Sequence, residues 1–325
     1  MRIPLALLSL VFLITACNKK DESIPMELDD KEKVIVKAAS TYTVNLVQNI
    51  TYAAALKHTD WNGATRSKIE LKLDAYIPGN SLLKRPALVL IHGGSLDVGS
   101  RKDPNIVDMA HYFASRGWVV FSLDYRMKSD KGTVPLAWEQ KTSNEDVLKI
   151  YPANRDVKAA IRWLYANSET YNIDTNYITV GGGSAGAFLS ISLGVTEPED
   201  YTNELSITKD PTLSSTNLKQ PSKVHTIINF WGGEAYVKIL ELVYGLERFD
   251  SNDAPILIAH GTDDNIVDFS SAEILKKKYQ RTGIYYEFYP LDGFRHSAWN
   301  ATVNGKSLSD LAYEFILLEQ EITIE

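Results

Sequence analysis

The sequence has 325 residues, of which 44% are hydrophobic and 23% are charged, and its formal net charge is −7 at pH 7. This composition is that of a folded globular protein, and the length suits one large α/β domain or two smaller domains. The acidic excess and the lack of a Lys/Arg cluster argue against a nucleic-acid-binding groove. The single cysteine, Cys17, excludes an internal disulfide and a cysteine-based metal site.

The first residues have the features of an export signal. Arg2 gives a basic start, and residues 3–16 form an apolar segment shorter than the ~20 residues that a membrane-spanning helix needs. The segment ends in I-T-A-C, which resembles the lipobox of bacterial lipoproteins. The resemblance implies a signal peptide over residues 1–16 and lipidation of Cys17. A plain secretory signal followed by a chance cysteine is the alternative.

Residues 17–33 carry many charges and few large apolar groups, which predicts a flexible tether. Its lysine-then-acidic run, residues 19–22, resembles the surface-export signal of Bacteroidetes lipoproteins, although tether residues are in any case often polar. We therefore expect a lipid-anchored protein of the bacterial cell envelope, at the outer membrane and exposed on the surface. Its only membrane contact would be the lipid anchor, and residues 34–325 would form a single domain.

The rest of the chain alternates between strand and helix patterns. Apolar and charged residues alternate over 69–75, which predicts a half-exposed antiparallel strand, whereas the continuous apolar run at 86–91 predicts a strand covered on both faces. Further strands are expected at 118–123, 178–180, 224–230, 255–259 and 284–291, and helices at 104–116, 154–171, 187–195, 268–281 and 309–322. This order predicts a mostly parallel sheet with helices on both faces and a functional site at the carboxyl ends of the strands.

Two segments, 127–151 and 196–223, fit neither pattern and are predicted to be inserted loops, which in a compact domain are often functional. We expect the first of them and the whole segment 196–250 to form the walls of the site. Their expected wall side chains mix aromatic and polar groups: Trp138, Glu139, Tyr151, Trp231, Glu234, Tyr236 and Tyr244.

The stretch 177–186 reads Y-I-T-V-G-G-G-S-A-G and contains G-x-S-x-G around Ser184. A strand that stops at glycines, a serine and then a helix are the context of a nucleophile elbow. The glycines suit a serine on a sharp turn with strained backbone angles, and the helix N-terminus suits a developing oxyanion. Since G-x-G-x-x-G and the lysine of a P-loop are both absent, a phosphate-binding turn is the weaker interpretation.

A nucleophilic serine needs a base to take its proton and a carboxylate to orient that base. The chain supplies H-G-T-D-D at 260–264 and then His296, with room for one helix and one strand between them. This order of serine, acid and histidine is the one found in α/β-hydrolases. Of the other histidines, three are expected to be structural: His111, His225 and His260.

Taken together, five motifs resemble the α/β-hydrolase serine esterases of the group with hormone-sensitive-lipase-like and feruloyl- and acetyl-esterase-like proteins, over residues 50–322. They are H-G-G-S, D-Y-R, G-G-G-S-A-G-A, H-G-T-D-D and G-F-R-H, in the expected order. The resemblance implies an α/β-hydrolase fold and a catalytic triad of Ser184, Asp264 and His296. The family's acid stands two positions after the threonine-like residue, which favours Asp264 over Asp263.

The H-G-G-S motif resembles an oxyanion loop, whose amides would act together with that of Ala185. Ser95 stands where the family usually has a third glycine. Either Gly93 and Gly94 or Gly94 and Ser95 would therefore point their amides into the site. His92 is expected to brace this loop.

Two positions depart from the family pattern. Gly183 precedes the serine where many relatives carry an acidic residue, and residues 265–268 stand where V-V-P is common. Neither departure removes a catalytic group.

These features predict a serine carboxylic-ester hydrolase that works through an acyl-enzyme, without a metal or an organic cofactor. An aminoacyl- or dipeptidyl-peptidase-like enzyme shares the triad, but usually adds a large N-terminal propeller and a glutamate pair for the substrate amine. A non-catalytic cell-envelope binding lipoprotein would more naturally have lost one of the three residues. The mixed aromatic and polar walls favour short-acyl or aromatic-acyl esters, on small molecules or on glycans, over long-chain lipids.

Overall fold

The computed structural model describes residues 34–79 and 84–325, which belong to one compact unit. The predicted signal peptide, the lipidation site at Cys17 and the tether lie outside the described residues. Within the described part, no helix has both the length and the apolar character needed to cross a membrane.

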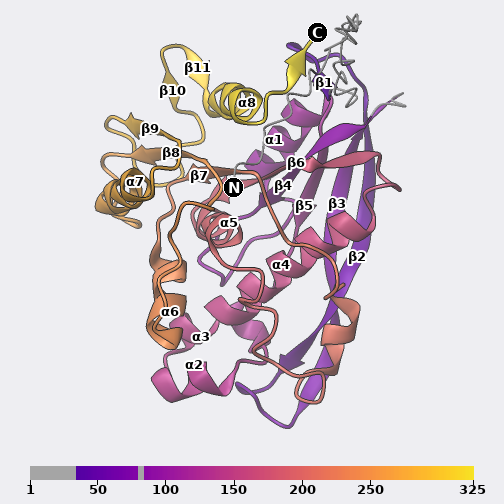
Figure 1. Ribbon diagram of the computed structural model, residues 1–325, viewed down its shortest axis with the longest axis vertical. Helices are drawn as coiled ribbons and strands as arrows, with labels where there is room; N and C mark the ends of the chain where they lie inside the picture. The colour runs from indigo at the N-terminus through magenta and orange to yellow at the C-terminus, as the bar shows by residue number, and fades with distance from the viewer. Residues whose placement is uncertain (1–33, 80–83) are drawn as a thin grey trace, which may run out of the picture. The chain divides into compact units, whose positions relative to one another are not determined.

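An eight-stranded sheet with the order β2-β3-β5-β4-β6-β7-β8-β9 forms the centre of this unit (Figure 1). The strand β3 pairs antiparallel with β2 and β5, and every pair from β5 to β9 is parallel. The strands are β2 (Val44–His58), β3 (Arg66–Pro78), β4 (Arg85–Ile91), β5 (Val119–Leu123), β6 (Ile173–Gly183), β7 (Thr226–Phe230), β8 (Ile256–Gly261) and β9 (Tyr286–Leu291). The mostly parallel sheet predicted from the strand and helix pattern is therefore confirmed.

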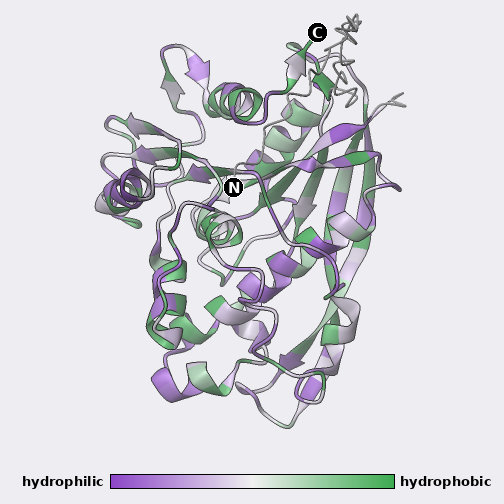
Figure 2. Cartoon of the chain, viewed as in Figure 1, coloured by the Kyte–Doolittle hydropathy of each residue, from purple (hydrophilic) through white to green (hydrophobic). Residues whose placement is uncertain are grey.

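Helices cover both faces of this sheet. Buried residues of α1 and α8 pack on one face, and those of α4, α5, α6 and α7 pack on the other. The helices are α1 (Pro104–Ala114), α4 (Ile150–Ala166), α5 (Ala185–Val195), α6 (Ala235–Tyr244), α7 (Ser270–Thr282) and α8 (Leu308–Glu319). Figure 2 shows hydrophobic residues along the central strands and a mostly hydrophilic α7 at the edge.

Local sequence explains where several of these elements begin and end. Helix α1 begins at Pro104, and the Asp103 side chain caps it by accepting the amide N–H groups of Asn105 and Ile106. Helix α7 ends at Gly283, whose φ of 76° is a left-handed conformation that glycine adopts without strain.

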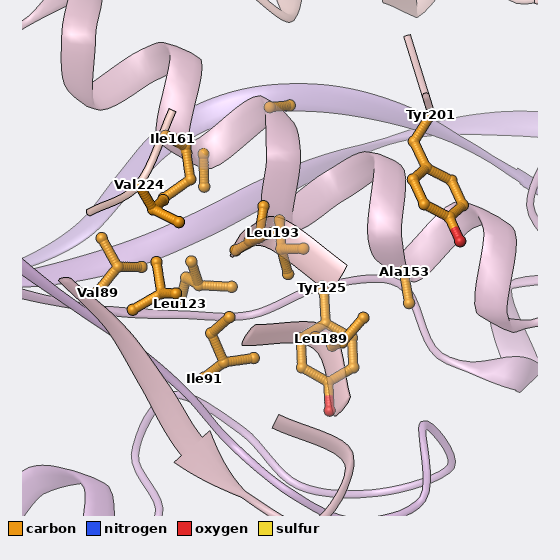
Figure 3. Packing of buried hydrophobic residues seen from close by; sticks show 14 of the residues in the cluster. Val89, Ile91, Leu123, Tyr125, Ala153, Ile161, Leu189, Leu193, Tyr201 and Val224 are labelled. Carbon is orange, nitrogen blue, oxygen red and sulfur yellow. The ribbon is translucent and has the colours of Figure 1, made fainter. Parts of the chain in front are cut away.

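The core beside the site is built from β4, β5, α4 and α5. All seven residues of β4 are buried, as expected for a strand covered on both faces. Figure 3 shows Val89 and Ile91 of this strand near Leu123 of β5, with Leu189 and Leu193 of α5 to their right. Because this core is close-packed, it fixes the strand ends that carry the site.

The segment 127–151 is not the loop that the sequence predicts. It contains the short helices η1 (Lys128–Asp130), α2 (Leu136–Lys141) and α3 (Glu145–Leu148), and α4 already begins at Ile150. Fully buried Trp138 packs edge-on against buried Tyr151 at 5.5 Å between ring centroids. Such tertiary contacts stabilise helices too short to form alone.

The second predicted loop contains only one short helical element, and the helix α6 that follows it was not predicted. The remaining elements are η2 (Pro211–Ser215) and two small sheets, β1 (Ile35–Val36) with β12 (Thr323–Ile324) and β10 (Thr302–Val303) with β11 (Lys306–Ser307).

Buried cations of α4 hold the segment 196–216 in place. Arg155 pairs with Asp210 at 2.7 Å, and both side chains are almost completely buried. Lys158 Nζ donates to the carbonyl of Asp200 at 2.9 Å, and Arg162 donates to the carbonyl of Thr216 at 2.8 Å. These contacts fix the segment on α4.

Candidate active site

Ser184 lies between the end of β6 and the start of α5, with φ 55° and ψ −125°. This conformation is strained for a residue with a Cβ, and such strain is common at functional sites. The Ser184 amide donates to the carbonyl of Phe230 on the next strand at 2.9 Å, and its own carbonyl accepts the amides of Ala187 and Phe188. These bonds hold the turn and leave the hydroxyl at the carboxyl edge of the sheet.

Glycines beside Ser184 allow β6 and α5 to press against the end of β4. A Cβ on Gly182 would lie 2.1 Å from the carbonyl oxygen of Ile91, and a Cβ on Gly186 would lie 1.9 Å from the same oxygen. No side chain fits at either position, which explains the G-x-S-x-G pattern in steric terms.

The structure brings Ser184, His296 and Asp264 together from the carboxyl ends of β6, β9 and β8. His296 Nε2 lies 3.0 Å from Ser184 Oγ, and His296 Nδ1 lies 2.8 Å from Asp264 Oδ2. Because a carboxylate only accepts hydrogen bonds, Nδ1 carries the proton, and Nε2 is left to accept the serine hydroxyl. This arrangement places a base on the serine and a carboxylate behind the base.

Asp264 is buried and its carboxylate is fully engaged. Its Oδ1 accepts the amides of Ile266 at 2.9 Å and Val267 at 3.0 Å. Burial acts to raise the pKa of Asp264, but the hydrogen bonds from His296 and from these two amides outweigh it, and the pKa lies below its usual value. Asp263 is exposed, and its amide donates to the carbonyl of Phe294. The residue beside His296 is therefore Asp264.

A second histidine contacts the same loop. His260 is fully buried, with Nε2 2.8 Å from the carbonyl oxygen of Val267 and 3.1 Å from Asp264 Oδ2. Since a carbonyl only accepts, Nε2 carries the proton. Burial lowers the pKa of His260, which favours the neutral ring. His260 thus holds the turn whose amides bind the Asp264 carboxylate.

The predicted oxyanion loop lies directly beside the serine. A Cβ on Gly93 would lie 2.9 Å from the carbonyl oxygen of Gly183 and 3.4 Å from Ser184 Cβ. Within the described part of the chain, the amides of Gly93, Gly94 and Ser95 have no backbone acceptor. The amide of Ala185 is the first in α5 and so has no partner inside the helix.

The backbone of this loop is unusual. Three successive residues, Gly94, Ser95 and Leu96, have φ values of 104°, 57° and 59°. The left-handed conformation of Ser95 explains why glycine suits this position. The amide of Lys128 donates to the carbonyl of Leu96 at 2.8 Å, and Lys149 pairs with Asp97 at 3.0 Å. The segment 127–151 therefore supports the loop from outside the pocket.

His92 lies inside this loop and does not line the pocket. The ring is fully buried and stacks on Tyr125 at 4.4 Å between centroids. Nδ1 lies 2.7 Å from the carbonyl oxygen of Gly93, and the Tyr125 hydroxyl donates to the carbonyl of His92 at 2.9 Å. These contacts brace the loop.

A cavity of about 420 Å³ opens above the serine. Its wall is formed by Gly93, Gly94, Ser95, Val98, Gly99, Asp103, Ile106, Gly183, Ser184, Trp231, Ile266, His296, Ser297 and Trp299. Of the expected wall residues only Trp231 lines this cavity: Trp138 and Tyr151 are buried in the core, and Glu139, Glu234, Tyr236 and Tyr244 are not part of the wall. Sequence reasoning missed Val98, Gly99, Asp103, Ile106, Ile266, Ser297 and Trp299. The only signal for Trp299 was its place three residues after His296. Among the described residues, no group of three His, Cys, Asp or Glu side chains is placed to hold a metal ion.

Two tryptophans form one side of the cavity. Their rings meet edge to face at 4.9 Å, and Trp231 also lies edge-on to His296 at 6.4 Å. A Cβ on Gly183 would lie 2.9 Å from the Trp299 ring and 3.0 Å from the Trp231 ring. The indoles thus occupy the space that a side chain before Ser184 would need, which explains the glycine at this position.

The BD-FAE family model matches residues 73–242, more than half of the chain. The chain belongs to the BD-FAE family. The match includes the predicted oxyanion loop and Ser184, whereas Asp264 and His296 lie beyond it. In this BD-FAE chain, it is therefore the structure and not the family match that places Asp264 and His296 beside Ser184.

This BD-FAE chain is similar to curated hydrolases over part of their length. It is 26% identical over 215 residues to Esterase LipC of Mycobacterium tuberculosis, covering 58% of this chain and 46% of that protein. It is 34% identical over 119 residues to Phenmedipham hydrolase of Pseudarthrobacter oxydans, covering 36% of this chain and 22% of that protein. The chain thus spans less than half the length of these curated relatives.

Solved structures similar to this BD-FAE chain include esterase 2 of Thermogutta terrifontis phosphonylated by cyclosarin. The TM-score is 0.60 at 23% identity, covering 86% of this chain and 94% of that one. The same esterase phosphorylated by paraoxon gives a TM-score of 0.59 at 23% identity, covering 82% and 94%. This likeness confirms the predicted α/β-hydrolase fold.

Proposed function

We propose that this protein is a serine carboxylic-ester hydrolase with Ser184 as nucleophile, His296 as base and Asp264 as acid. The observation that carries the proposal is the continuous hydrogen-bonded series from Asp264 through His296 to Ser184. The names of its relatives, which are esterases and carboxylic-ester hydrolases, support the same reaction class.

The reaction follows from this geometry. Ser184 Oγ attacks the ester carbonyl carbon while His296 Nε2 takes the hydroxyl proton, and the Asp264 carboxylate stabilises the resulting imidazolium. The oxyanion is stabilised by the Ala185 amide and by amides of the loop at 93–95. Collapse of the intermediate breaks the bond to the alcohol, which takes the proton from His296. Water, deprotonated by His296, then releases the acid from the acyl-enzyme and restores Ser184.

For the substrate, we propose short-acyl or aromatic-acyl esters, on small molecules or on glycans. The edge-to-face pair of Trp231 and Trp299 supports this proposal, because it limits the space beside Ser184 and offers an aromatic face. A long acyl chain would need a broad apolar trough. Rates on 4-nitrophenyl esters from C2 to C12, together with acetylated xylan and methyl ferulate, test this proposal. An optimum at C8 or longer without release from either plant substrate refutes it.

The reaction itself is tested with Ser184→Ala on 4-nitrophenyl acetate. The variant keeps the fold and loses a factor of ~10⁴–10⁶ in kcat, as is typical when a triad member is removed. Ser214→Ala, at an exposed serine of η2, is the matched control and keeps the wild-type rate. Wild-type turnover of a dipeptide nitroanilide without ester hydrolysis would favour the peptidase alternative, and turnover of neither would favour the binding protein.

We also propose that a lipid on Cys17 anchors the protein at the outer membrane of the bacterial envelope, on the cell surface. The lipobox-like sequence supports this proposal. Metabolic fatty-acid labelling of the wild type and of Cys17→Ser tests it. An unlabelled wild type contradicts the anchor, and protection of labelled protein from protease on intact cells contradicts the surface location.

A further inference from the structure

One carboxylate faces the cavity without a role in the hydrogen-bonded series described above. Asp103 lines the same cavity as Ser184 and His296 and is half-buried. Its Oδ1 accepts the amides of Asn105 at 3.0 Å and Ile106 at 3.4 Å, which caps α1. The cap fixes the carboxylate on a rigid element and leaves its second oxygen without a hydrogen bond to any described residue.

No lysine or arginine side chain in the wall of the cavity balances the charge of Asp103. Of the side chains that form the wall, Asp103 is the only acidic one and none is lysine or arginine. The neighbouring Arg101 is turned away and pairs with Asp74 at 2.9 Å and also with Asp124. A fixed negative charge therefore lies in the wall of the cavity that a group beside Ser184 would enter.

We propose that Asp103 sets the charge selectivity of the site. It disfavours esters that bring a second negative charge into the cavity, and it accepts hydrogen bonds from hydroxyl-bearing neutral substrates or pairs with cationic ones. The physical reason is that a carboxylate in a partly enclosed, low-dielectric site repels an anion more strongly than it would in water. This inference rests on the proposed ester hydrolysis and adds the charge class of its substrate.

The test uses Asp103→Asn, because asparagine caps a helix about as well as aspartate and the change isolates the charge. Asp108→Asn is the matched control, since Asp108 is an exposed carboxylate on the same helix. Two pairs of a neutral and an anionic ester are compared by kcat/KM: 4-nitrophenyl acetate with mono-4-nitrophenyl succinate, and phenyl acetate with 4-acetoxybenzoate.

We expect Asp103→Asn to raise the kcat/KM for the anionic ester, relative to that for the neutral ester, on the order of tenfold in at least one pair. Added salt reduces the difference between wild type and variant because it screens the repulsion. Asp108→Asn keeps the wild-type ratios. Ratios that are the same in the wild type and Asp103→Asn overturn the inference. A wild type that hydrolyses none of the four esters refutes the proposed function itself, which is a separate result.

Discussion

At the scale of single residues, the choice between two adjacent aspartates depends on what each side chain contacts. Asp264 accepts two amides and faces His296, whereas Asp263 is exposed. We expect Asp264→Asn to lower kcat by about 10⁴, because an amide favours the wrong tautomer of the histidine. Asp263→Asn is the control and stays near the wild-type rate. A greater loss in Asp263→Asn than in Asp264→Asn would contradict the assignment.

His260 offers a second residue-scale prediction, since its Nε2–H holds the Val267 carbonyl. His260→Leu removes this donor, so the turn that positions Asp264 loosens, and we expect kcat to fall about tenfold. His260→Gln places an amide N–H at a similar reach and recovers most of the rate. Equal rates in both variants would show that the hydrogen bond to the Val267 carbonyl does not matter.

Sequence order places Ser184, Asp264 and His296 at the carboxyl edge because each follows a strand of a parallel sheet. The rest of the pocket could not be predicted in this way. Trp299 lies in the loop after β9 and Asp103 at the start of α1, and their approach to Ser184 depends on loop paths that have no periodic pattern.

At the scale of elements, the buried pair Arg155–Asp210 connects α4 to the segment before β7. Asp210→Ala leaves a buried arginine without its partner, and we expect it to lower the free energy of unfolding by about 3–5 kcal/mol. The double variant Arg155→Met with Asp210→Leu recovers most of this loss. Denaturant unfolding measures both. If Asp210→Ala is as stable as the wild type, the ion pair has no structural role.

Element prediction succeeded where the pattern was long and regular, and failed where stability comes from distant contacts. The amphipathic α7 and the mostly apolar β4 were predicted close to their observed bounds. Helices α2 and α3 have only six and four residues, too few for a readable period. Their stability depends on tertiary contacts such as that of Trp138 with Tyr151, which the local sequence does not indicate.

At the scale of the whole molecule, the parallel core and its two helical layers follow from alternating buried strands and helices, and this is why the fold class could be predicted. The polar insertions were harder to place. Their charged residues predict exposed loops, but several of these residues are buried against α4, including Asp200 and Asp210. A hydropathy pattern cannot distinguish a solvated charge from one that is buried with a partner.

Asp253, which is buried before β8, provides a prediction for the pH dependence of stability. Burial raises its pKa to about 8, although the amide of Asp250 acts in the opposite direction. Between the ordinary aspartate pKa of about 4 and this value, the folded state binds more protons than the unfolded state. The stability that this group contributes is therefore present below pH 4 and is lost as the pH rises toward 8.

Asp253→Asn removes this titration, and its amide oxygen still accepts the amide N–H of Asp250. We expect its melting temperature, relative to that of the wild type, to be higher at pH 8.5 than at pH 5. Thermal unfolding at both values measures the difference, and Asp108→Asn, an exposed carboxylate, should follow the wild type at both. Melting curves of Asp253→Asn that run parallel to the wild type across this range would show that Asp253 ionises in the folded protein like an exposed aspartate.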